Sequence, residues 1–408
     1  MNDMVLTGIE WCPEIPDDWT INKVKNCFYI SKQQAGIKNT TVLKLARDGV
    51  KVRDISNNEG QLAESYDNYN PVKPGDLLLN PMDLYSGANC NMSEIEGVIS
   101  PAYVNLRRKV DLNPKFFDYY FKVQYWTMAM FAHGKGVSFD NRWTINAEGV
   151  KNYEIPFPSY EEQNKIVDYI EKSISKIDAL ISNQQQQIEK LKQYKQSLIT
   201  EVVNKGLDRN VAMKDSGIDW AVKIPKNWRI AKLKMICSMQ SGNNITSNQI
   251  NPNEGRYPVY GGNGFRGYYD KYNIEGERCI IGRQGALAGN VHYVTGQYWA
   301  TDHAVVVTPK GEVTNEYLYY VLIAMNLNRY AYETAAQPGL AVSKVENLLV
   351  PFPAQINEQK KIVSFIKKRC YDIDELVNVK LSKIEKLNQY KKSLIYEYVT
   401  GKKRVPEA

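Results

Sequence analysis

Two stretches of the chain carry apolar residues at alternating spacings of three and four, the pattern of a heptad seam. They run from about 160 to 204 and from about 355 to 399, and neither contains proline or glycine. About 45 residues at ~1.5 Å each predict a helix roughly 65 Å long, and Gly206 and Gly401 follow as stops. The seam residues are Ile170, Ile177, Ile181, Ile188, Leu191 and Leu198, then Ile366, Ile373, Val377, Ile384, Leu387 and Leu394.

Polar residues interrupt both seams at matching places, with Gln184 and Lys195 in the first and Lys380 and Lys391 in the second. Polar seam positions favour specific pairing over maximal stability. The alternative is two surface helices packed on separate domains. Matched register and length favour mutual antiparallel pairing.

The chain is an internal repeat. GIEWCPEIPDDWTINKVK at 8–25 returns as GIDWAVKIPKNWRIAKLK at 217–234, and the block at 155–203 returns at 350–399. The first pair is shifted by 209 residues and the helical pair by 196, so the segment between them is 13 residues longer in the first half. The intervening segments share little sequence. Each half is therefore a constant frame around a variable insert.

Both inserts show a mixed α+β pattern, with short strands bounded by Gly-rich turns and followed by a helix. We therefore expect the inserts to share a fold, with corresponding loops at 133–138 and 337–343 that lead into the constant blocks. The expected strands are 98–106, 278–282, 291–294 and 303–308, and the expected helices are 114–121 and 316–323.

Charge permits an anionic partner without demanding one, because 52 Lys and Arg face 45 Asp and Glu. The insert 26–155 carries 15 basic and 14 acidic residues, and the insert 229–350 carries 11 and 9. Phosphate neutralisation drives DNA affinity, so tight binding by such inserts requires a partner that supplies more positive charge.

Candidate nucleic-acid contacts lie in the basic and Gly-rich stretches of the inserts, where backbone can approach phosphate and polar forks can reach base edges. For each one the alternative is a solvated surface residue, and the tyrosines around Gly267 suit packing on the sheet as well as stacking on DNA. The candidates are Arg107, Lys135, Ser138, Asn141, Arg142, Asn263, Arg266, Arg283, Gln284 and Lys344.

Cysteine and histidine usage argues against zinc and disulfides. The six cysteines form no CxxC pair, and the three histidines have no partner at metal spacing. Free buried thiols in a reducing cytoplasm are the expectation. The N-terminal residues have no apolar signal core, and no stretch approaches a membrane span.

Motifs for catalysis are missing. The nearest matches to a methyltransferase pattern are 261–264 and 80–83, and the latter lacks the second proline and the aromatic that would hold a flipped base. No phosphate-binding GxxxxGK[ST] occurs. Glu358-Gln-Lys360 fits a degenerate nuclease pattern, but lies at the start of a predicted helix where solvated charge is ordinary. We predict a non-catalytic binding protein.

Taken together, these motifs resemble the specificity (S) subunit of type I restriction–modification enzymes. Both copies of the family pattern are present, with Ile15-Pro16 and Trp19 matching Ile224-Pro225 and Trp228, and with Glu162-Gln163 matching Glu358-Gln359. The resemblance implies two pseudo-symmetric α+β target-recognition domains separated by two long antiparallel coiled-coil helices. The implied segments are recognition domains at 1–157 and 209–352 and conserved helical spacers at 158–208 and 353–408.

The resemblance also implies partners and a division of labour. Two modification subunits would carry S-adenosylmethionine, and two restriction subunits would use ATP and Mg, with no cofactor bound by this chain. Each recognition domain would read one half of a bipartite asymmetric site in double-stranded DNA, and the helices would fix the spacer and dock the modification subunits. Because inserts differ between members, the contact residues are not carried over.

Two alternative hypotheses about the function predict different behaviour. A coiled-coil scaffold without DNA specificity would show no sequence preference with any partner. A fused methyltransferase or nuclease would be active by itself with S-adenosylmethionine or a divalent metal.

Overall fold

The computed structural model divides the chain into two compact units. Unit 1 consists of Met1–Asn183 with Ser382–Ala408, and unit 2 is Gln184–Leu381. This division differs from the four segments expected from sequence, because each unit contains part of both long helices. The structure describes residues 3–32, 34, 36, 41–56, 65–82, 84, 90–136, 143–285, 287–334 and 337–406.

The long helices are α4 (Tyr160–Lys205) and α8 (Ile356–Val399), close to the predicted bounds. Each is followed by a glycine in the left-handed region, Gly206 at φ +71° and Gly401 at φ +73°. Such a residue ends a helix because its successor cannot continue the hydrogen-bond ladder, and glycine adopts this conformation without a Cβ penalty.

In each unit the two helices pair antiparallel. Asp178 of unit 1 binds Lys391 at 2.8 Å, and the rings of Tyr169 and Tyr398 are in tilted contact at 4.7 Å between centroids. Residue numbers that rise along one helix therefore meet numbers that fall along the other. Unit 2 shows the same order, with Lys195 bound to Asp374 at 2.6 Å. Lys380 then bonds to Gln184 at 3.4 Å and to Gln187.

The twelve predicted seam residues are all buried or half-buried. Full burial of a Leu or Ile side chain contributes about 1.5–3 kcal/mol, so the seam stabilises the pairing. The polar seam residues Lys195 and Lys391 reach acids on the facing helix instead of lying unpaired. Their ammonium groups stay partly solvated while their stems cover the seam.

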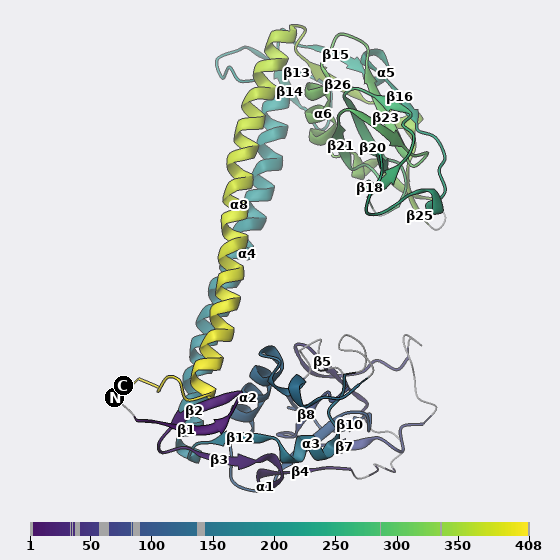
Figure 1. The fold of residues 1–408 in the computed structure, drawn as a ribbon. Helices are drawn as coiled ribbons and strands as arrows, with labels where there is room; N and C mark the ends of the chain where they lie inside the picture. Colours follow the sequence, from purple (N-terminus) through teal and green to yellow (C-terminus); the bar gives the residue numbers. More distant parts are fainter. Residues whose placement is uncertain are drawn as a thin grey trace. The chain divides into compact units, whose positions relative to one another are not determined.

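Each unit has a four-stranded antiparallel central sheet with the same strand order. Figure 1 shows the strands of each unit as arrows. In unit 1 the order is β4 (Phe28–Ile30), β11 (Val104–Arg108), β8 (Leu77–Leu79) and β9 (Cys90–Met92). In unit 2 it is β16 (Cys237–Ser241), β23 (Ala304–Pro309), β20 (Arg278–Gly282) and β21 (Val291–Val294). The expected common fold of the inserts is therefore present at the level of strand order.

One helix follows the second strand of each sheet, α2 (Pro114–Trp126) in unit 1 and α6 (Asn315–Ala324) in unit 2. Both begin at a capping side chain, which satisfies a backbone N–H that the helix leaves open. The Asn113 side chain accepts from Lys115 N at 2.9 Å, and the Thr314 hydroxyl accepts from Tyr317 N at 3.2 Å.

The second sheets also correspond. In unit 2, β17 (Tyr257–Gly261) pairs antiparallel with β18 (Gly264–Tyr269) and parallel with β22 (Gln297–Ala300), which pairs antiparallel with β19 (Ile274–Glu275). In unit 1, β5 (Leu43–Ala46) pairs with β6 (Gly49–Val52), and β10 (Gly97–Ile99) pairs with β7 (Asn70–Val72). A parallel bridge between Val42 and Val98 links those two strand pairs, as the parallel pairing of β17 with β22 does in unit 2.

Short elements complete each unit. The paired strands are β1 (Met4–Ile9) with β2 (Cys12–Pro16), β3 (Thr20–Lys23) with β12 (Glu154–Phe157), β13 (Met213–Asp215) with β14 (Lys223–Pro225), β15 (Arg229–Lys232) with β26 (Leu349–Phe352), and β24 (Ala331–Thr334) with β25 (Gln337–Leu340). The short helices are α1 (Val24–Cys27), η1 (Ala129–His133), α3 (Ala147–Asn152), α5 (Leu233–Ile236), η2 (Ser247–Gln249), η3 (Leu327–Tyr330) and α7 (Val342–Val345).

The expected strand at 98–106 is wrong as a single element. The chain turns at Ser100, where Tyr103 N bonds to the Ser100 carbonyl at 3.1 Å, so that β10 ends at Ile99 and β11 starts at Val104 in another sheet. Pro101 stands inside this turn, and proline cannot donate to a central strand ladder. The other predicted strands and helices are present with ends shifted by a few residues.

Each unit has its own main core, and all six cysteines lie buried with free thiols. Burial raises the pKa of Cys12 and Cys27 to about 11, which suppresses the reactive thiolate. In the part of the chain that the structure describes, no helix is both long enough and apolar enough to span a membrane.

Candidate nucleic-acid interface

The repeated Glu-Gln motif joins each long helix to the insert of its unit. Gln163 is fully buried, its amide donates to the Pro158 carbonyl at 2.9 Å, and its oxygen accepts from Asn113 N at 2.8 Å. Gln359 does the same with the Pro353 carbonyl and Thr314 N, both at 3.0 Å. The side-chain oxygen of each glutamine therefore holds the N-cap residue of the insert helix, Asn113 of α2 or Thr314 of α6. This bond fixes the insert against the long helix that carries the glutamine.

The repeated tryptophan serves the same frame. Trp228 donates its indole N–H to Glu358 Oε1 at 2.9 Å, so the Glu358-Gln-Lys360 pattern is occupied in a structural contact. In unit 1, Glu162 instead accepts from Arg404 at 3.1 Å, and this guanidinium lies 5.9 Å from the Trp19 ring and also binds Asp18. The motifs that identified the repeat therefore build the scaffold.

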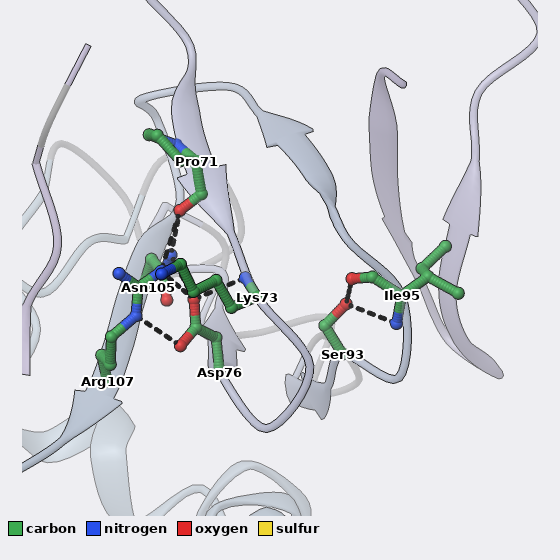
Figure 2. A network of polar contacts seen from close by, with 7 residues as sticks. All are labelled: Pro71, Lys73, Asp76, Ser93, Ile95, Asn105 and Arg107. Atoms are coloured by element: carbon green, nitrogen blue, oxygen red, sulfur yellow. Dashed lines mark hydrogen bonds and ion pairs between the residues drawn. The ribbon is translucent and has the colours of Figure 1, made fainter. Parts of the chain in front are cut away.

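Arg107, a predicted DNA contact, is held by an internal network (Figure 2). Its guanidinium binds both oxygens of Asp76, at 2.8 and 2.6 Å, and reaches the Pro71 carbonyl at 3.3 Å. Asn105 completes the network with a bond to Asp76 at 3.1 Å. The Asp76 carboxylate raises the pKa of Arg107, and the paired geometry favours a structural role for this arginine.

Other predicted contacts in unit 1 are only partly described. Lys135 is exposed and its backbone forms a bridge with Thr144. Ser138, Asn141 and Arg142 lie outside the described residues.

In unit 2 the structure brings four predicted contacts to one edge of the fold. Asn263 is exposed in the turn between β17 and β18, and Arg266 is exposed within β18. Arg283 and Gln284 are exposed just after β20. Gly282 and Gly262 pack backbone to backbone, because a Cβ added at Gly282 would lie 2.1 Å from the Gly262 carbonyl oxygen. We call the four residues Asn263, Arg266, Arg283 and Gln284 the hairpin edge.

Lys344 is exposed on α7, the short helix that precedes β26. The tyrosines beyond the hairpin edge pack with other rings. Tyr268 contacts Phe265 at 5.2 Å between ring centroids, and Tyr269 contacts Trp299 at 5.1 Å, so both rings are supported by the sheet.

Sequence reasoning missed the residues that mount the hairpin edge. Arg283 N donates to the His303 carbonyl at 3.0 Å, and the Arg283 side chain reaches the Ser241 hydroxyl at 3.3 Å. The doubled Gly261-Gly262 was the signal in the sequence, since such a pair allows close backbone approach, but its partner strand could not be read from spacing.

Comparison with known families matches residues 102–190 and 225–386, more than half of the chain, to the type I restriction modification DNA specificity domain. The two matched segments together reach both recognition folds and both long helices. The chain therefore belongs to this family.

Particular relatives agree. The EcoprrI specificity subunit of Escherichia coli is 42% identical over 136 residues, which is 33% of each chain. The MjaVIII specificity subunit of Methanocaldococcus jannaschii is 21% identical over 96% of this chain and 94% of its own. A chain solved in a study of complex assembly and conformational transition of the type I R-M system has a TM-score of 0.69 at 14% identity, covering 94% of this chain and 98% of that one.

Proposed function

We propose that this chain is the non-catalytic subunit that selects DNA sequence, with each unit reading one half of a bipartite asymmetric site. The observation that carries the proposal is one fold built twice, with the same strand order in both central sheets and different side chains at the loops. The same fold presents its loops at equivalent places in both units, and different side chains on those loops select different bases.

The helices would fix the distance between the half-sites. Each unit contains part of α4 and part of α8, joined by the same Lys–Asp contact. A continuous helix transmits length at ~1.5 Å per residue. The spacing of two half-sites is set by the geometry of the protein that reads them.

The outer helix faces would dock two modification subunits. Two pairs of equivalent helix residues, related by the 196-residue shift, are exposed in the two units: Leu180 with Leu376 and Tyr194 with Tyr390, each between 48 and 58% exposed. Exposed apolar residues that recur at equivalent positions favour a partner surface. S-adenosylmethionine would belong to those subunits, and ATP and Mg to two restriction subunits.

The near balance of basic and acidic residues in the inserts supports a role for partner subunits in DNA binding. Affinity for DNA grows with the number of phosphates neutralised. A specificity subunit with little spare positive charge would bind tightly only within the complex, in the cytoplasm where DNA and partners meet.

The decisive experiment compares adenine methylation at base resolution in the native host with this gene intact and deleted. Loss of one gapped asymmetric motif on deletion is the expected result. An unchanged methylome, with no sequence preference of the complex formed with its modification subunits on a randomised duplex library, would reject the proposal in favour of a scaffold.

The spacer role has a separate test. Insertion of seven residues, about two helical turns, at matched positions in α4 and α8 should lengthen the spacer and leave both half-sites unchanged. A changed half-site would contradict the ruler role.

A further inference from the structure

Arg283 is mounted more rigidly than a surface arginine on a loop. Its N–H donates to the His303 carbonyl at 3.0 Å, and its carbonyl accepts from Leu340 N at 2.8 Å. The next residue, Gln284, forms an antiparallel bridge with Gly339. The backbone that carries this side chain is therefore fixed from two sides.

The β17–β18 turn closes against the same position. A Cβ at Gly262 would lie 3.1 Å from the His303 carbonyl oxygen and 3.7 Å from Arg283 N. Together with the contact between Gly282 and Gly262, this approach sets Asn263 beside Arg283. Two residues with amide side chains adjoin this position, Gln284 as the next residue of the chain and Asn263 as the residue after Gly262 in the turn.

The guanidinium itself remains available. Arg283 is exposed, and among the described residues no carboxylate lies within ion-pair distance of it, the Ser241 hydroxyl at 3.3 Å being a weak contact. Two other arginines differ in this respect, because Arg107 is engaged by Asp76 and Arg229 by Glu312. Engaging Arg283 would therefore cost neither the breaking of an ion pair nor the ordering of its backbone.

The chemistry of this group suits base edges. An arginine fork binds O6 and N7 of guanine in the major groove, and Asn or Gln binds adenine. We propose that Arg283 reads a guanine in the half-site of unit 2. This inference rests on the proposed function, and the competing role is a phosphate contact, which positions DNA without selecting sequence.

The test uses Arg283→Gln and Arg283→Lys in the full chain in its native host, with adenine methylation mapped at base resolution. Arg283→Lys keeps the charge and loses the fork. Both variants should relax selection at one guanine of one half-site by roughly ten- to a hundredfold, with the other half-site and the spacer unchanged. Arg256→Gln is the matched control, since Arg256 is exposed in the same unit and lies over the Tyr257 ring.

An unchanged motif in both variants, or a partial reduction of methylation that is uniform over all sites without relaxation at one position, would overturn the proposal. If both variants lose all methylation, purified complexes are tested on a duplex library randomised at each half-site position. Relaxation at one guanine there supports the base contact, and unrelaxed preference rejects it. Failure of the proposed function is distinguishable, because the wild-type chain would then leave no motif to relax.

Discussion

The two units solve the same packing problem with opposite chemistry. On β11 of unit 1, Asn105 and Arg107 bind Asp76 in a largely buried network. The residues 201 positions later on β23 are Val306 and Thr308, and Val306 belongs to an apolar cluster with Ile280 and Tyr298. The sheets nevertheless keep the same strand order, with Asn105 opposite Leu78 and Val306 opposite Ile280.

This difference shows what the fold requires of an insert. Buried polar groups are tolerated when they are paired, and apolar groups of suitable volume serve equally well. The buried glutamine of the frame, in contrast, makes the same two bonds in both units. The frame therefore fixes the backbone, and the insert is free to vary its side chains.

The largest effect is expected from Asp76→Ala, which removes the carboxylate that Arg107 and Asn105 share in unit 1 and leaves them the Pro71 carbonyl. Removing one partner of a buried ion pair costs about 3–5 kcal/mol, and the partial exposure of Arg107 places this case at about 3 kcal/mol or below. Amide hydrogen exchange read peptide by peptide should show the loss in unit 1. Thr308→Val in unit 2 is the control and should change stability by less than about 0.5 kcal/mol.

The double variant Asp76→Leu with Arg107→Leu sharpens the same comparison. Replacing both partners with apolar residues should recover much of the lost stability, as the apolar solution of unit 2 suggests. If stability is not recovered, the network contributes to the fold of unit 1 beyond the pairing of Arg107 with Asp76.

A smaller difference is expected between Trp228→Phe and Trp19→Phe. Both variants lose ring volume, but only Trp228 donates to a carboxylate, and Trp19 Nε1 is buried without a partner. A hydrogen bond to a charged group contributes about 1.5–3 kcal/mol, so Trp228→Phe should cost more by about 1–2 kcal/mol. Equal costs in chemical unfolding would show that the Glu358 contact is dispensable.

The helix contacts should behave alike in both units. Lys195→Ala and Lys391→Ala each remove one partly exposed Lys–Asp pair, with side-chain exposures of 32/55% and 30/52%. Exposed pairs contribute about 0–1 kcal/mol and weaken with salt. Thermal unfolding at low and high ionic strength should therefore give matching small losses. A large loss in only one variant would break the equivalence of the two helix pairs.

The smallest effect is a pH dependence confined to unit 2. Burial lowers the pKa of His292, whose place opposite Ile280 is taken in unit 1 by Asn91 opposite Leu78. Below its unfolded pKa of about 6.5, the unfolded state binds the proton that the folded state resists, so stability falls with pH from that value down to the folded pKa. Hydrogen exchange in unit 2 between pH 7 and 5 should show this slope, and His292→Asn should flatten it.

Much of the frame could be predicted because its information is local and repeated. The seam spacing gave both long helices to within a few residues, and the repeated motifs gave the duplication. The break at Ser100 was missed because apolar residues continue on both sides of a turn. The pairing of Arg107 with Asp76 was missed because the two residues lie on different strands, and no spacing reports that contact.

What the sequence determined by itself was the duplication, the two helices and their seam, since periodicity depends only on residues a few positions apart. Tertiary structure decided which arginine is sequestered and which is presented. Arg107 and Arg283 are alike as residues, and both follow apolar strand residues. In the folded sheet the Asp76 carboxylate lies against Arg107, whereas the backbone of Gly262 lies beside Arg283. The partners of each side chain are set by strand neighbours that are distant in the sequence.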